Sequence, residues 1–111
     1  MSALRKRLEN IRGKSGITFR EVAQLLDTTP QTISRWQSGE SNPHPKSLDR
    51  LLTLDWLVEQ LSQFYEPDEA KLWLFSRHQL LGGERPADRI AQGRIEDVLQ
   101  LIDQLQSSAY L

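Results

Sequence analysis

The chain has 111 residues, a formal net charge of −1, 38% hydrophobic residues and no cysteine. This length predicts one compact unit, or two very small subdomains that share a core. The absence of cysteine excludes a disulfide framework and a thiolate metal site, and it favours a protein of the reducing cytoplasm. We expect neither a signal peptide nor a membrane segment, because no apolar region follows the basic start and no apolar run approaches the ~18 residues of a span.

Residues 3–14 are predicted to form the first helix, with Ser2 as its cap. Leu4, Leu8 and Ile11 recur at i, i+4 and i+7, so they form one apolar stripe that faces a core. Basic residues surround this stripe: Arg5, Lys6, Arg7, Arg12 and Lys14. They form either a solvated face or a set of phosphate contacts, which would add affinity for nucleic acid without reading its sequence.

A short helix is predicted next, over residues 16–27. Thr18 and Glu21 fit a capping box at its start, in which each side chain accepts from a backbone N–H near the other. Its apolar stripe consists of Val22, Leu25 and Leu26. A tight turn follows over residues 27–29, because Asp27 tolerates the left-handed conformation that such a turn often needs.

A second short helix, over residues 29–39, carries clear start and stop signals. Thr29 is a candidate N-cap, Pro30 suits the first helical position, and Gly39 suits the left-handed residue that ends a helix. The outward side of this helix carries no carboxylate but has Gln31, Thr32 and Arg35. Gln pairs bidentately with adenine and Arg with guanine in the major groove. Two short helices joined by a tight turn, the second with a polar outer face, form a helix-turn-helix pattern.

Residues 4–54 resemble the Cro/C1-type helix-turn-helix of phage repressors, in the Xre-like lineage. The positions that carry the resemblance are Thr18, Glu21, Val22, Ala23, Thr28, Thr29, Gln31, Ile33, Trp36, Gly39 and Pro43. The resemblance implies that DNA is contacted by Thr29, Gln31, Thr32, Arg35, Asn42, Lys46 and Arg20. The chain departs from the family at Phe19 and Pro30, where phage repressors often carry a phosphate-binding Gln and a polar base reader. Direct readout of bases therefore falls mainly on Gln31, Thr32 and Arg35.

A helical pattern resumes at Pro45 and runs without Pro or Gly until Pro67. One helix of some 20 residues and two helices with a bend near residues 53–54 both fit this pattern. Its apolar residues occupy more than one stripe, so several sides of the helix have to be covered. Either the C-terminal region covers them, or one side forms a dimer interface.

Three further helices are predicted after Pro67. The first begins at Pro67 with acidic residues in its first turn, where the helix dipole favours them. A short helix opens at Pro86 and closes at Gly93, and the last helix starts at about Arg94. No strand pattern appears anywhere. The predicted fold class is therefore all-α, with a helix-turn-helix bundle over residues 1–54 and a small helical domain over residues 55–111.

The charge divides along the chain. Residues 1–50 hold nine Lys/Arg against five Asp/Glu, a net charge of +4. Residues 51–111 hold five Lys/Arg against ten Asp/Glu, a net charge of −5. A basic half and an acidic half indicate two partners of opposite character. The alternative is an ordinary fluctuation in a small protein.

Residues 66–106 resemble the toxin-binding domain of Xre/MbcA/ParS-type antitoxins. The motifs that carry this resemblance are Trp73-Leu74, Leu81-Gly82-Gly83, Pro86 and Gly93, followed by an apolar helix. The family commonly has Asn or Asp just before its Leu-Gly-Gly motif, where this chain has Arg77-His78-Gln79. The resemblance implies toxin contacts from Trp73, Gly82, Gly83, Arg85, Arg89, Tyr110 and Leu111. Trp73 also fits a core position, and the arginines also fit plain solvated charges.

Together the two resemblances imply an antitoxin. Such a protein binds a cognate toxin of the RES-domain class, which degrades NAD⁺, and covers the entrance of its active-site pocket. It also represses its own operon through the helix-turn-helix, as a homodimer within a larger hetero-oligomer. The acidic second half suits this role, because NAD⁺ sites carry positive groups for the pyrophosphate.

Two other functions fit the sequence. One is a stand-alone dimeric repressor, and the other is an interaction protein whose helix-turn-helix has lost DNA binding. An enzyme is not expected, because the two histidines are isolated and no Ser/His/Asp or paired-carboxylate arrangement converges. For the same reasons no metal site and no cofactor is expected.

Overall fold

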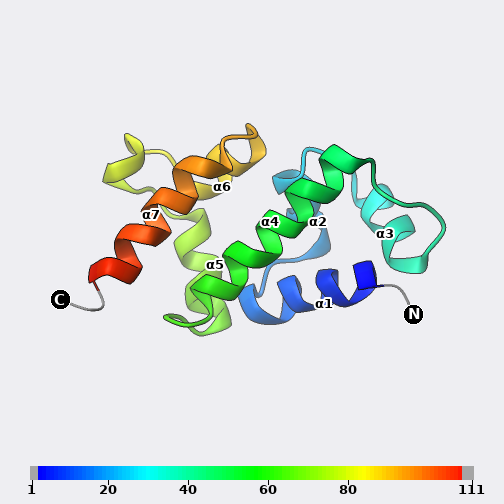
Figure 1. Cartoon of the computed structure of the whole chain (residues 1–111), viewed down its shortest axis with the longest axis horizontal. Coiled ribbons are helices and arrows are strands. Elements are labelled where there is room, and N and C mark those ends of the chain that lie inside the picture. Colours follow the sequence, from blue (N-terminus) through cyan, green and yellow to red (C-terminus); the bar gives the residue numbers. More distant parts are fainter. Residues whose placement is uncertain (1–2, 109–111) are drawn as a thin grey trace.

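The computed structural model describes residues 3–108 and consists of helices joined by short loops (Figure 1). The elements, in chain order, are α1 Ala3–Ser15, α2 Phe19–Leu25, α3 Pro30–Ser38, α4 Pro45–Leu61, α5 Pro67–Phe75, the 3₁₀ helix η1 Gln79–Leu81, α6 Pro86–Ala91 and α7 Ile95–Ser108. Within residues 3–108 the only β-pairing is an isolated bridge between His78 and Glu84. The all-α fold class predicted from the sequence is confirmed.

The caps of α2 and α3 form as the sequence predicts. Thr18 and Glu21 make the reciprocal capping box of α2, whose helix is shorter than the predicted residues 16–27. The Thr29 hydroxyl accepts from the Thr32 N–H at 3.2 Å, and Gly39 ends α3 with a φ of +85°. Ser2, the predicted cap of α1, lies outside the described residues.

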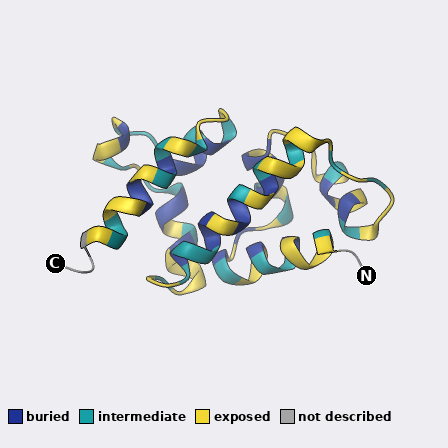
Figure 2. Cartoon of the chain, in the orientation of Figure 1, coloured by how far each residue is buried: buried dark blue, intermediate teal, exposed yellow. Residues whose placement is uncertain are grey.

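α4 is one continuous helix without a bend, and it runs through the centre of the molecule (Figure 1). α1 packs along one side of it and α7 along the other. Leu54, Leu57 and Leu61 on its inner side are fully buried. The C-terminal region thus covers part of α4, whereas Leu48 and Trp56 stay exposed, as the mixed burial of this helix shows (Figure 2).

One hydrophobic core joins the N-terminal and C-terminal halves. Its buried residues include Leu8 and Ile33 from the first half and Leu74 and Ile102 from the second. Because this core is shared and α4 crosses position 54, the division into residues 1–54 and 55–111 stays a prediction.

A polar seam fixes α1 against α4. Asp55 is 5% exposed, and its carboxylate accepts from Arg7 at 2.8 Å and from Asn10 at 2.7 Å. One turn further along, Lys14 pairs with Glu59. In each pair one partner lies on α1 and the other on α4, so these contacts set the register of α1 along α4.

Candidate functional site

α3 has an exposed polar side and a buried apolar side. Ile33 and Trp36 are 0% and 4% exposed and hold the helix on the core. Burying a side chain of the size of Ile33 contributes about 1.5–3 kcal/mol. Gln31 and Arg35 are exposed, so they stand away from the buried side as the sequence predicts. Thr32 is half-buried, and its hydroxyl lies 2.9 Å from the Thr29 hydroxyl, so both groups are already engaged at the helix start.

The orientation of α3 is fixed by a contact that the sequence does not reveal. Gln37 donates from Nε2 to Oε1 of Glu9 on α1 at 2.8 Å. Arg12 pairs with the same carboxylate at 3.2 Å, and its guanidinium stacks over the Phe19 ring at 4.8 Å. Phe19 is half-buried against the core, so here it links α2 to α1.

Of the other predicted DNA contacts, Asn42 and Lys46 follow α3 directly in the chain, whereas Arg20 lies in the first turn of α2, next to Glu21, which pairs with Lys71 of α5. Asn42, in the loop after α3, and Lys46, in the first turn of α4, are both exposed. Arg20 is exposed on α2. The end formed by α3 and the start of α4 lies opposite the C-terminal end of α7 (Figure 1). The individual DNA contacts stay predictions.

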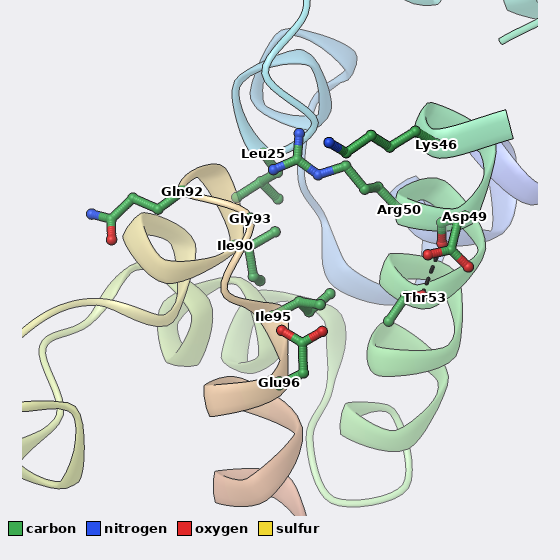
Figure 3. Close-up of a pocket in the computed structure, with 10 residues that line it drawn as sticks. All are labelled: Leu25, Lys46, Asp49, Arg50, Thr53, Ile90, Gln92, Gly93, Ile95 and Glu96. Carbon is green, nitrogen blue, oxygen red and sulfur yellow. Dashed lines mark hydrogen bonds between the residues drawn. The ribbon is translucent and has the colours of Figure 1, made fainter. Parts of the chain in front are cut away.

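A cleft of about 360 Å³ lies where the two halves meet (Figure 3). Arg50 extends from α4 across this cleft toward the turn between α6 and α7. Its Nη1 lies 3.5 Å from the Leu26 carbonyl oxygen. Gly93 has a φ of +79°, and a Cβ there would come 2.9 Å from the Arg50 Nη2. Gly93 therefore does more than close α6, because it also makes room for Arg50.

The Leu81-Gly82-Gly83 segment forms a closed turn in the C-terminal half. Gly82 and Gly83 both have positive φ, +66° and +85°. The His78 N–H donates to the Glu84 carbonyl at 3.0 Å, and the Gly83 N–H donates to the His78 carbonyl at 3.0 Å. The glycines are thus needed for the turn itself, and Gly82 is exposed on its outside.

Arg89 holds this turn from the inside. Its side chain is 14% exposed, with Nη1 2.6 Å from Asp97 and Nη2 2.9 Å from the Leu81 carbonyl oxygen. The hydrogen bond to Asp97, together with Glu84, raises the pKa of Arg89. By contrast Arg85 is 44% exposed and pairs with Asp88 at 2.7 Å. Arg85 is therefore the more accessible of the two predicted toxin-contacting arginines.

Trp73 lies in the core, 8% exposed, and its ring packs 4.9 Å from the ring of His78. A shallow hollow of about 270 Å³ lies beside it, lined by Trp73, His78, Leu80, Leu101, Gln104 and Leu105. Leu80, one of these lining residues, is 71% exposed. Leu72 on α5 does not line the hollow and is 68% exposed.

The sequence predicts Leu72 and Leu80 as apolar residues of the helix that begins at Pro67, whereas α5 ends at Phe75 and both leucines are exposed. The sequence could have indicated that Leu72 is exposed, because Leu72 falls outside the buried stripe of α5, which consists of Ala70, Trp73 and Leu74. Tyr110 and Leu111, also predicted to contact a toxin, lie outside the described residues.

Within residues 3–108, no group of three or more His, Cys, Asp or Glu residues could hold a metal ion. No described helix has both the length and the apolar character for crossing a membrane.

Two family models match the chain. A helix-turn-helix domain matches residues 3–54, and the antitoxin Xre/MbcA/ParS C-terminal toxin-binding domain matches residues 61–107. The mycobacterial cidal antitoxin MbcA of Mycobacterium tuberculosis is 31% identical over 96 residues, which cover 86% of this chain and 85% of the relative. A probable mycobacterial cidal antitoxin of the same organism is 32% identical over 96 residues, with coverages of 86% and 82%.

The fold agrees with these matches. A chain in the crystal structure of the M. tuberculosis MbcT–MbcA toxin–antitoxin complex has a TM-score of 0.83 and 28% identity, and the match covers 100% of both chains. The curated relatives are antitoxins by name, in agreement with the expectation that this chain is not an enzyme. Identity of this level over most of both chains shows that the chain belongs to the Xre/MbcA/ParS family of antitoxins.

Proposed function

We propose that the chain neutralises a cognate toxin by binding it through the C-terminal half and binds operator DNA through α3. The match over the whole chain to a protein from the MbcT–MbcA toxin–antitoxin complex is the observation that carries this proposal. It acts by binding and not by catalysis, in the cytoplasm, where both partners would be found.

The toxin in this proposal is a RES-domain enzyme that degrades NAD⁺, and the antitoxin covers its pocket. α7 supports this part, because Ile95–Ser108 contains three acidic residues and no Lys or Arg. An anionic helix complements the positive groups that bind a dinucleotide pyrophosphate.

Leu72 and Leu80 are the proposed apolar anchors, since exposed leucines at the centre of an interface exclude water. Gly82, Gly83 and Arg85 follow Leu80 closely in the chain, while Trp73 and Arg89 act by holding the surface in shape. Tyr110 and Leu111 are proposed to reach the toxin from the end of α7.

The test of this function is inhibition of the purified toxin. The full-length chain, added at stoichiometric amounts, is expected to stop NAD⁺ consumption. Leu80→Asp places a charge in the contact and is expected to lose inhibition, whereas Leu52→Asp, an exposed leucine on α4, keeps it. A full-length chain that leaves NAD⁺ consumption unchanged in excess contradicts the proposal and favours a stand-alone dimeric repressor.

DNA binding is the second part of the proposal. Gln31 and Arg35 are exposed on α3, and Asn42 and Lys46 are exposed in the segment that follows it. Side chains of these types contact base edges and phosphates. We propose that the target is the operator of the chain's own operon. An antitoxin that inhibits the toxin but does not bind this DNA would be an interaction protein with a degenerate helix-turn-helix.

A further inference from the structure

Four polar side chains from one side of α4 line the cleft between the two halves. These residues, at i, i+3, i+4 and i+7 and so on one side of the helix, are Lys46, Asp49, Arg50 and Thr53. The facing wall is built mainly from apolar side chains, those of Leu25, Ile90 and Ile95. The cleft therefore has a charged wall and an apolar wall (Figure 3).

Lys46 and Arg50 are neighbouring cations without a carboxylate partner. They lie one turn apart on α4, and both side chains reach over the same side of the cleft (Figure 3). The only hydrogen bond or ion pair that either makes within residues 3–108 is the 3.5 Å approach of the Arg50 Nη1 to the Leu26 carbonyl oxygen. Like charges at this spacing repel each other. An anion between them removes the repulsion, and a guanidinium offers a phosphate two parallel N–H donors.

The opposite end of the cleft carries a hydrogen-bond acceptor. Glu96, in the first turn of α7, lies there, away from Arg50 (Figure 3). In the part of the chain that the structure describes, the Glu96 carboxylate makes no hydrogen bond and no ion pair. An ionised carboxylate only accepts, so this end suits hydroxyl or amino groups of a ligand. Asp49 is a second such carboxylate, so the four charges sum to zero and an anion is favoured only at the Lys46–Arg50 end.

We propose that the cleft binds a nucleoside monophosphate. Lys46 and Arg50 hold the phosphate. The base packs on Ile90 and Ile95, and hydroxyl groups of the ligand donate to Glu96. Inorganic phosphate alone leaves the apolar wall uncovered, and an uncharged ring leaves the two cations unpaired. A volume of about 360 Å³ lies near the lower end of the range of small-molecule sites, roughly 300–1,000 Å³, and this favours one nucleotide over a dinucleotide.

The bound nucleotide contacts both halves of the chain. Arg50 belongs to α4, whereas Ile90 lies on α6 and Ile95 and Glu96 lie on α7. The unfolded chain lacks this cleft, so a ligand that binds there stabilises the folded state by an amount that grows with its concentration. Thermal unfolding therefore reports binding without a label.

Isothermal titration calorimetry with AMP, on the full-length chain without toxin or DNA, tests the cleft. We expect one AMP per chain, and a Tm that rises with the concentration of AMP. Adenosine lacks the phosphate, and inorganic phosphate lacks the ring. Each is expected to bind at least about 10-fold more weakly than AMP, because each loses one set of contacts.

Two variants locate the site. Arg50→Gln removes charge-assisted hydrogen bonds to the phosphate and is expected to raise the dissociation constant of AMP about 10-fold or more. Thr53→Phe keeps both cations but fills the cleft, so it is expected to abolish AMP binding. Arg77→Gln is the matched control, since it removes the same charge from an exposed position after α5. Circular dichroism checks that each variant folds.

Several results would overturn the proposal. A chain that gives neither heat nor a change in Tm with AMP has no nucleotide site. AMP binding that Arg50→Gln or Thr53→Phe leaves unchanged takes place elsewhere on the molecule. Inorganic phosphate that binds as tightly as AMP assigns the cleft to a free anion. A chain that does not bind AMP but loses affinity for the operator in Arg50→Gln assigns Arg50 to DNA.

This inference is independent of the proposed function. Neither toxin nor operator is present in the titration, so AMP binding succeeds or fails whether or not the chain neutralises a toxin. Conversely, an Arg50→Gln variant that still inhibits NAD⁺ consumption fully while it no longer binds AMP supports a site separate from the surface proposed for the toxin.

Discussion

Arg35 is the residue on which the proposed reading of DNA most depends. It is exposed in the last turn of α3, two positions after the fully buried Ile33, so the helix holds its Cα firmly while its guanidinium faces outward. The outward position of Arg35 could be predicted from the sequence, because the cap signals and the apolar pair of α3 depend only on residues within and next to this helix. The hydrogen bond from Gln37 to Glu9 could not, since it joins residues 28 positions apart and depends on how α1 packs.

Arg35→Ala is expected to weaken binding to the operator by about 1–3 kcal/mol, because a guanidinium that contacts a base edge is lost. Fluorescence anisotropy with a labelled operator fragment measures the change. Arg77→Ala is the control, since it removes the same charge from the exposed segment after α5. Equal affinity of Arg35→Ala and the natural chain would mean that α3 does not read DNA.

Glu59 links stability to pH at the seam between α1 and α4. Its hydrogen bonds from Lys14 and Asn10 lower its pKa below the ordinary value of 4.5. The unfolded chain therefore binds a proton more readily than the folded one, and the stability from this pair is fully present above about pH 4.5. It is lost as the pH falls through the lowered pKa of the folded state.

Thermal unfolding of Glu59→Gln measures this contribution. The variant is expected to have a lower Tm than the natural chain at neutral pH, and the difference is expected to shrink under acidic conditions. Glu96→Gln, which removes an exposed carboxylate from α7, serves as the control. A difference in Tm that stays constant as the pH falls would show that the Lys14–Glu59 pair does not stabilise the fold.

At the scale of elements, helix ends are easier to predict than helix contacts. The capping box of α2, the Thr29 cap and Gly39 each depend on residues within four positions, and all three form as predicted. Gly93 was predicted only as the end of a helix. Its approach to Arg50 depends on how the turn between α6 and α7 meets α4, which no local pattern encodes.

Gly93→Ala is expected to destabilise the protein, because it combines a left-handed backbone with a contact of 2.9 Å to Arg50. The backbone alone costs about 1–2 kcal/mol. Urea unfolding measures the free energy of unfolding. Gly13→Ala is the control: Gly13 lies within α1 and a Cβ there would meet nothing within 4 Å, so this change is expected to stabilise by about 0.5–1 kcal/mol.

The pair of glycine variants separates two explanations. If Gly93→Ala stabilises the protein as Gly13→Ala does, the turn has freedom to adjust and Arg50 does not need the space. If Gly93→Ala destabilises it, replacing Arg50 by Ala as well is expected to recover only the part due to the contact, since the left-handed backbone of residue 93 remains.

At the scale of the whole molecule, α4 belongs to both halves. It contributes fully buried leucines along its length, from Leu51 near the helix-turn-helix to Leu61 near α5. Sequence patterns separate the chain into two family resemblances, because each motif is local. The shared core is visible only in the fold, and it joins the surface proposed for DNA to the surface proposed for the toxin.

We expect the two halves to unfold in one cooperative transition, because neither keeps its core without α4. Trp36 and Trp73 are 4% and 8% exposed and report on the first and second half. Two variants isolate these reporters: one replaces Trp56 and Trp73 with Phe, and the other replaces Trp36 and Trp56 with Phe. In each, the urea midpoint from fluorescence is expected to equal the midpoint from far-ultraviolet circular dichroism. If the midpoint from fluorescence differs from that from circular dichroism in either variant, the halves fold independently, and the boundary at residues 54–55 would then divide true domains.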